Sequence, residues 1–149
     1  MNANGHGLTR SSGQTLAVLL WLAALSACDI RPTAPETRAS YFVEKFIVEP
    51  QNETDLRGIT GLSENQNPET LMKDLQTRTA VSYLRARHRL GAELGFHIAS
   101  TNRRANGDMV VEVTVSEGVP AVGKPLTVRF QVELRNQNRQ WIVVHLQSD

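Results

Sequence analysis

Three histidines lie downstream of the apolar amino-terminal segment, and imidazole is the side chain best suited to metal binding and to proton transfer near neutral pH. They are His88, His97 and His145. No two stand three or four residues apart, the spacing that places two metal ligands on one helix face, and the single cysteine lies far upstream. His97 and His145 fall in predicted strands that could expose them on one sheet face. We expect two partly exposed strand histidines and no metal or cofactor site.

The carboxylates offer no obvious pair for acid–base catalysis. Asp108 stands beside a predicted turn, and Asp149 is the last residue. Glu112, Glu117 and Glu133 fall at strand positions that we expect to face solvent, where an acid–base dyad is hard to assemble. The sequence also lacks the glycine patterns of nucleophile elbows, phosphate loops and dinucleotide sites. We predict that the protein is not an enzyme, with a small enzyme kept as an alternative.

Arginines cluster in one predicted helix. Arg78, Arg85 and Arg89 recur at seven- and four-residue steps, with Arg87 and His88 adjoining them. Residues at these steps share one side of a helix. Such a stripe could dock an acidic partner or anionic lipid headgroups. The alternative is a solvated helix face whose charge is balanced by nearby acidic residues.

The overall charge argues against one class of partner. The chain has 16 basic and 15 acidic residues, and Arg10 is the only charged residue before Cys28. Removal of the segment before Cys28 therefore leaves a formally neutral chain. Nucleic-acid-binding domains usually carry a clear basic excess, so we expect no nucleic-acid partner.

An uncharged apolar run from Leu16 to Leu25 precedes Cys28, the single cysteine. Ten helical residues span about 15 Å, roughly half of a bilayer's hydrocarbon core, which is too short for a stable transmembrane helix. The run has the length and position of a signal-peptide apolar region. A lone cysteine cannot form an internal disulfide bond, so it needs another explanation.

The residues Leu25-Ser26-Ala27-Cys28 resemble the lipobox of bacterial prolipoproteins. The resemblance implies that the Cys28 thiol receives a diacylglyceryl group, that cleavage occurs before it, and that the new amine is acylated. Two or three acyl chains, palmitate among them, give durable membrane attachment. Asp29 resembles an inner-membrane retention signal, so we expect the periplasmic face of the inner membrane, with the outer membrane as the alternative. The other explanation of Cys28 is a buried free thiol behind an ordinary signal.

Three segments follow from this interpretation. Residues 1–27 form the lipoprotein signal peptide, 28–38 a lipidated tether, and 39–149 the periplasmic domain. The tether contains Pro32 and Pro35, which disfavour helix and hold it extended.

The first half of the domain is predicted to be helical. One helix starts at Ser40 and ends before Pro50, and a polar stretch with room for a short turn of helix follows. A longer helix starts at Pro68 behind an asparagine cap and runs to Leu90, before a glycine stop. Its inward face is predicted from apolar residues at three- and four-residue steps: Met72, Leu75, Thr79, Tyr83, Ala86 and Leu90, with Ala80 and Leu84 beside them.

From residue 94 the apolar period changes to two. Alternating segments near 96–98, 109–116 and 126–135 predict amphipathic strands, and residues 141–146 predict a strand covered on both faces. Asn106-Gly107 predicts a hairpin turn. The fold class is therefore α+β, with N-terminal helices packed on a curved antiparallel sheet of about four strands.

This order of elements resembles the cystatin-like and nuclear-transport-factor-2-like α+β rolls, over roughly residues 39–147. In these rolls a long helix lies in the concave side of a curved sheet, and Trp141-Ile142 matches the tryptophan–aliphatic pair often found in the last strand. The resemblance is architectural and includes no diagnostic motif. It implies an interior that could hold a small apolar ligand near Tyr83, Phe96, Phe130 and Trp141.

We therefore predict a membrane-anchored, non-catalytic module that contacts an envelope protein or a secretion assembly. The contact surface would be the Arg78, Arg85 and Arg89 stripe or the exposed sheet face. A carrier or sensor of a small apolar ligand is the first alternative, and a small roll-fold enzyme the second. The polar sheet face is formed by Thr127, Arg129, Gln131 and Glu133.

Overall fold

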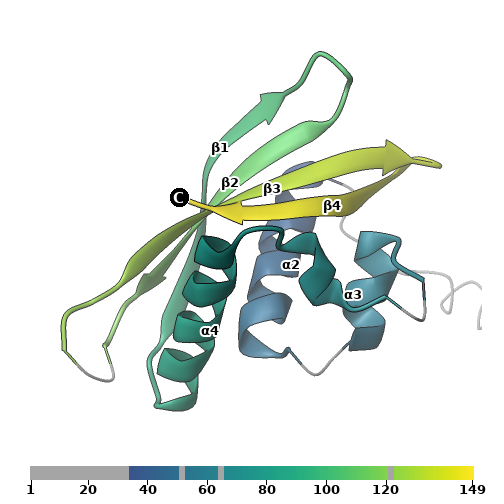
Figure 1. The fold of residues 1–149 in the computed structure, drawn as a ribbon. Helices are drawn as coiled ribbons and strands as arrows, with labels where there is room; N and C mark the ends of the chain where they lie inside the picture. Colours follow the sequence, from purple (N-terminus) through teal and green to yellow (C-terminus); the bar gives the residue numbers. More distant parts are fainter. Residues whose placement is uncertain (1–33, 51–52, 64–65, 121–122) are drawn as a thin grey trace, which may run out of the picture. The chain divides into compact units, whose positions relative to one another are not determined.

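The computed structural model describes residues 34–50, 53–63, 66–120 and 123–149. The predicted signal peptide, Cys28 and Asp29 lie outside them. Helices come first and strands follow, which confirms the predicted α+β class (Figure 1). The helices are α2 (Pro35–Val48), α3 (Glu53–Thr60), the 3-10 helix η1 (Pro68–Leu71) and α4 (Leu75–Arg89). The strands are β1 (Leu94–Arg103), β2 (Met109–Glu117), β3 (Thr127–Gln137) and β4 (Gln140–Ser148).

The four strands form one antiparallel sheet in the order β1-β2-β3-β4. Irregularities in register at Ile98/Ser100 and Glu133/Leu134 increase its curvature. The Asn106-Gly107 turn joins β1 to β2 as predicted, with Gly107 at a φ of 88°. Asn138 and Arg139, both at positive φ, make the tight turn between β3 and β4.

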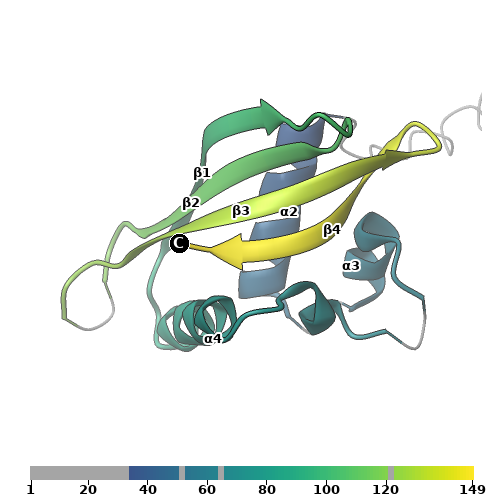
Figure 2. The ribbon, with the colours of Figure 1, turned by 45° about the horizontal axis from the view of Figure 1, so that its top comes forward.

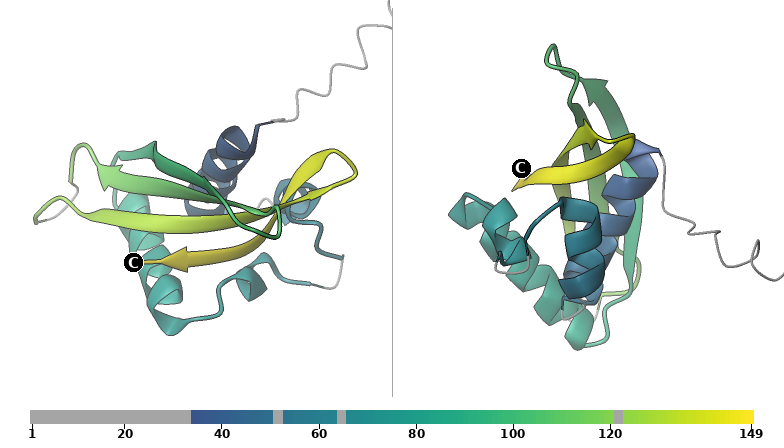
Figure 3. Two further views of the ribbon diagram at one scale, coloured as in Figure 1. Left: turned by 90° about the horizontal axis from the view of Figure 1, so that it is seen from above. Right: turned by 90° about the vertical axis from the view of Figure 1, so that its right-hand side faces the viewer.

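The core lies between the sheet and α2. Alternate residues of β2 and β3 point inward and are fully buried, among them Val113, Phe130 and Val132. They meet Phe42 and Phe46 of α2, whose rings stack with centroids 5.2 Å apart. Figure 2 shows α2 crossing behind the strands, with α4 beside the β4 side. In the left view of Figure 3, no helix of the described residues covers the opposite sheet face.

Helix α2 starts earlier than predicted. Pro35 occupies its first turn, where the absence of an N–H has no cost and the fixed φ suits a helix. Residues 35–38 therefore belong to the folded domain, whereas we expected them in the tether. None of the described helices is both long enough and apolar enough to cross a bilayer.

The predicted single helix from Pro68 to Leu90 is wrong. It is broken into η1 and α4, and Met72 between them is extended and bridges to Leu146 of β4. The break follows from Asp74, whose carboxylate caps a new helix by accepting a hydrogen bond from the backbone N–H of Thr77. The break fixes the rotation of α4, and therefore which of its side chains reach solvent.

Candidate interaction surface

Helix α4 buries a different face from the one that its apolar spacing predicted. Thr77, Val81 and Leu84 are fully buried. Leu75, Tyr83 and Leu90, assigned to the core by sequence, expose 79%, 51% and 67% of their surface. The predicted inward face is wrong because two stripes of three- and four-residue steps coexist on this helix. Periodicity alone does not choose between them.

A polar network at the amino end of α4 selects the buried stripe. Oγ1 of Thr77 donates to the Asp74 carboxylate (2.8 Å) and accepts from the backbone N–H of Ser148 at the end of β4 (2.7 Å). The hydrogen bonds from Thr77 hold the pKa of Asp74 below its usual range. The network fixes the first turn of α4 to β4 and turns Leu75 outward.

A buried ion pair holds the carboxyl end of α4. Arg87 Nη2 donates to Glu117 Oε2 at 2.6 Å and to the carbonyl of Lys124 at 3.2 Å, while Glu117 also accepts from the backbone N–H of Leu126. Hydrogen bonding by Arg87 lowers the pKa of Glu117. The expectation that Glu117 faces solvent is wrong, because it continues the inward alternation of Val113 and Val115.

Glu133 is also less exposed than predicted. It lies on the outer sheet face, but its side chain is only 16% exposed because Arg104 covers it at 3.0 Å. Glu112, on the same face, is half-buried.

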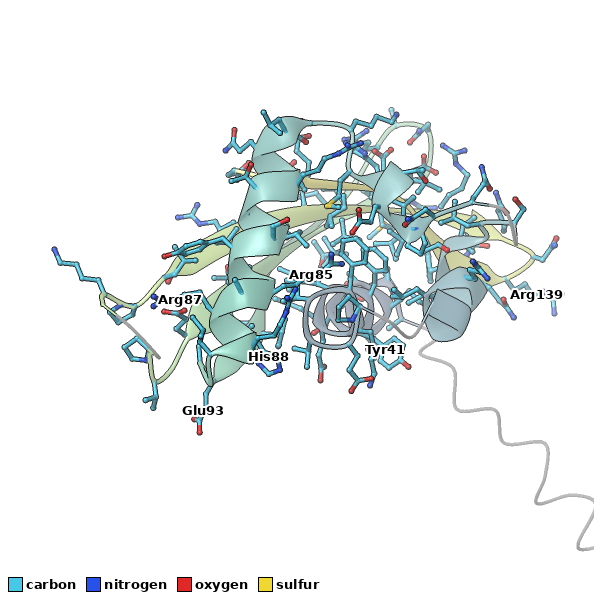
Figure 4. The ribbon with its side chains drawn as sticks, turned by 60° about the horizontal axis from the view of Figure 1, so that its bottom comes forward. Tyr41, Arg85, Arg87, His88, Glu93 and Arg139 are labelled. Carbon is cyan, nitrogen blue, oxygen red and sulfur yellow. The ribbon has the colours of Figure 1, made fainter. Side chains whose placement is uncertain are left out.

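The predicted arginine stripe divides into two kinds of residue. Arg85 is mostly buried: it donates to the carbonyl of Phe46, its Nη1 lies 2.9 Å from Oε1 of Glu69, and its guanidinium covers the Phe46 ring. Arg78 and Arg89 are exposed. Figure 4 shows Arg85 and His88 on the side of α4 that faces α2, and Arg87 on the opposite side. Arg85 therefore joins three helices, Arg78 donates from Nε to the carbonyl of Met72 at 3.1 Å, and the exposed parts of Arg78 and Arg89 face solvent.

A groove of about 550 Å³ lies between α4 and the start of β3. Pairing of β4 with β3 ends at Phe130, so the first residues of β3 extend beyond the last pair. The exposed stripe of α4 forms one wall and β3 the other. The lining residues are Leu75, Gln76, Thr79, Ala80, Tyr83, Leu126 and Val128. Sequence reasoning missed this groove because it assigned its apolar residues to the core.

A second hollow, also of about 550 Å³, lies between the carboxyl ends of α2 and α4. It is lined by Ile47, Pro50, Arg85, His88 and Arg89, together with Glu49 and Val48. Its walls mix cationic, anionic and apolar groups. Nδ1 of His88 lies 3.3 Å from the carbonyl oxygen of Ala92.

The four residues predicted to surround a ligand cavity do not meet in one place. Phe130 is fully buried in the core, and Phe96 and Trp141 pack against it from β1 and β4. Tyr83 is half exposed and lines the groove beside α4. Tyr83 therefore lies apart from the other three residues, which belong to the core or pack against it.

The candidate catalytic groups have structural contacts. Asp108 pairs with Arg135 at 3.0 Å, which lowers the pKa of the carboxyl group. The strand register places His97 and His145 on one sheet face but on strands β1 and β4, about 14 Å apart across the sheet. His97 is level with Arg129 and His145 with Glu133, so the two histidines are also offset by four residues along the strands. His145 Nδ1 lies 3.0 Å from the carbonyl oxygen of Leu71. Across the described ranges, His, Asp and Glu form no group of three that could hold a metal ion.

No protein-family model matches the chain, and no curated protein matches it. One similar solved structure is a variant of a designed nuclear-transport-factor-2-like protein, with 13% identity, a TM-score of 0.46, and coverage of 76% of this chain and 95% of that one. Another is the intermembrane space region of the chloroplast protein ARC6, with 10% identity, a TM-score of 0.37, and coverage of 94% of this chain and 98% of that one.

Proposed function

We propose that the protein is a membrane-anchored, non-catalytic interaction module of the bacterial cell envelope. The anchor would be the acyl chains on Cys28, and the partner an envelope protein or a component of a secretion assembly. Asp29 favours the periplasmic face of the inner membrane over the outer membrane. The lipobox sequence supports the anchor, and the surface of α4 supports the interaction role.

One observation carries the interaction role. Side chains as apolar as those of the core stand exposed along α4, with a groove beside them. Contiguous exposed apolar surface in a folded domain usually marks a binding site. Arg78 and Arg89 lie eleven residues apart on the same helix, about 16 Å along its axis.

The resemblance to cystatin-like and nuclear-transport-factor-2-like rolls belongs to this proposal as an expectation about architecture. Rolls of this kind serve many functions, so the assignment depends on the surface and not on the fold. The carrier alternative required Tyr83, Phe96, Phe130 and Trp141 around one interior hollow. Because Tyr83 lies on the external groove, away from the core that contains the other three, we propose the interaction role instead.

Two experiments test the proposal in the native bacterium. The first compares membrane fractionation of the parent chain with that of Cys28→Ser, which has no thiol to acylate. The variant should leave the membrane fraction, and unchanged fractionation would contradict lipid anchoring.

The second places a photo-crosslinking residue at Gln76 on the groove, at Arg89 near the carboxyl end of the exposed face of α4, or at Gln131 on the outer sheet face. The two α4 positions should yield a specific protein adduct that Gln131 does not. Adducts from Gln131 alone would move the interaction to the sheet face, and adducts from none of the three would contradict the interaction role.

A further inference from the structure

The exposed residues of one side of α4 and its C-cap form a seam whose large apolar side chains are Leu75, Tyr83 and Leu90. Leu75, Thr79, Tyr83, Ala86 and Leu90 are separated by four, four, three and four residues. This is the spacing with which a helix presents a seam to another helix. All five are exposed, and Leu75, Thr79 and Tyr83 also line the groove. The helix therefore has the pattern of a helix-packing surface without a packed helix among the described residues.

The charge beside this seam has one sign. Helix α4 contains four arginines and a histidine but no acidic residue. Glu69 neutralises Arg85 and Glu117 neutralises Arg87, both within the fold. Arg78 and Arg89 remain exposed along one border of the seam, the border that faces α2.

We propose that the groove between α4 and β3 receives an amphipathic helix of a partner protein, with apolar residues along one stripe and acidic residues beside it. The inference deepens the proposed interaction role and rests on it. Two apolar side chains, one helical turn apart on the partner, would enter the groove between Tyr83 and Val128. Carboxylates on the side of the partner helix away from β3 would meet Arg78 and Arg89. This is the helix-in-groove mode of recognition, with charge selecting the partner.

Shape and charge favour this occupant over two others. A bilayer surface presents no convex ridge to fill a groove of about 550 Å³, whereas a helix does. A second copy, packed through its own α4, would bring together two helices that contain no acidic residue. An amphipathic helix with acidic residues has the ridge that fills the groove and the negative charge that opposes Arg78 and Arg89.

The test uses the full chain with Cys28→Ser and three synthetic helical peptides. The first has a leucine stripe flanked by glutamate, the second the same stripe flanked by lysine, and the third the glutamate flanks with serine in place of leucine. Binding is measured by fluorescence anisotropy at two salt concentrations. Only the first peptide should bind, and more weakly at high salt, because its ion pairs are exposed to solvent.

Two variants locate the site. Leu75→Asp and Tyr83→Asp should each weaken binding about tenfold or more, the effect expected from losing one buried apolar side chain. Leu75→Asp should fold normally, because an acidic residue suits the first turn of a helix. Val119→Asp is the matched control: Val119 is 60% exposed but does not line the groove, so binding should change less than twofold.

Several outcomes would overturn the inference. Equal binding of the lysine-flanked peptide would remove the charge argument, and parent-like binding by both groove variants would remove the site. Tyr83-dependent binding to phosphatidylglycerol vesicles would assign the surface to lipid. Leu75-dependent dimers in sedimentation would assign it to a second copy. If any of these results is obtained and photo-crosslinking at Gln131 still gives a protein adduct in cells, the inference fails while the proposed function stands.

Discussion

The two faces of α4 differ in burial far more than in the residues that form them. The buried face combines Val81 and Leu84 with Thr77, and the exposed face combines Leu75 and Tyr83 with Thr79. The difference arises at the ends of the helix, where Thr77 is bonded to β4 and Arg87 to β2. The two faces have similar apolar content, so we infer that these polar contacts determine which face is buried. The other face, with Leu75, Thr79 and Tyr83, remains exposed to solvent.

The largest predicted effect compares the two faces directly. Leu84→Ala should lower the free energy of unfolding by about 2–5 kcal/mol, because it leaves a cavity in the core. Leu75→Ala should change it by about 0.5 kcal/mol or less, since its side chain is already in water. Urea denaturation followed by circular dichroism measures both. Similar losses for the two variants would show that the exposed face is packed in solution.

Breaking the ion pair at the carboxyl end should have the next largest effect. Glu117→Gln removes the carboxylate that pairs with the Arg87 guanidinium, in a site with little access to solvent. The unfolding midpoint in urea should fall clearly below that of the parent. The control is Glu93→Gln, which removes an exposed carboxylate and should leave the midpoint unchanged. Parent-like stability of Glu117→Gln would mean that the pair does not hold α4.

A smaller effect is expected at the amino end. Thr77→Val keeps the shape of the side chain but leaves the backbone N–H of Ser148 without its acceptor, at a cost of about 1–3 kcal/mol. Thr79→Val is the matched control, because its hydroxyl bonds only the carbonyl of Leu75 within the same exposed helix turn. Thermal melts of both variants give the comparison. Equal melting temperatures would remove Thr77 as the residue that orients the helix.

Acid should gradually weaken both ends of α4 and the Asp108–Arg135 ion pair between the strands. The pKa values of Asp74, Asp108 and Glu117 are lowered in the folded protein from ordinary values of 3.8, 3.8 and 4.5. The unfolded chain therefore binds more protons in acid, so the stability from these groups is complete above about pH 5 and is lost as the pH falls through the folded pKa values. The urea midpoint should be level down to about pH 5 and decline below it, less steeply in Asp108→Asn. A midpoint that rises from pH 5 to pH 3 would contradict this assignment.

The sheet could be predicted from the sequence, and the orientation of α4 could not. The alternating residues in 109–116 and 126–135 determine which face of each strand is buried, since a strand has only two faces and only one of them is apolar. Helix α4 has two apolar stripes, and the residue that decides between them bonds to Ser148, more than seventy positions away. Such a contact leaves no local signal.

The sequence did contain signals for the burial of Glu117 and for the start of α4, but we interpreted them differently. Glu117 lies two and four residues after Val115 and Val113, so its position in the strand already placed it on the inner face. Asp74, three residues before Thr77, has the spacing of a helix cap and marked the start of α4. The groove could not be predicted, because it depends on where β4 ends relative to β3.

The order of elements also has a consequence for biosynthesis. Phe42 and Phe46 of α2 are buried against strands that leave the ribosome only after all the helices have been made. In the nascent chain, the rings of Phe42 and Phe46 therefore lack their partners in the sheet until the last hairpin, β3–β4, is complete. A polypeptide that cannot close its core early keeps apolar surface exposed for longer during synthesis, and such surface is prone to aggregation.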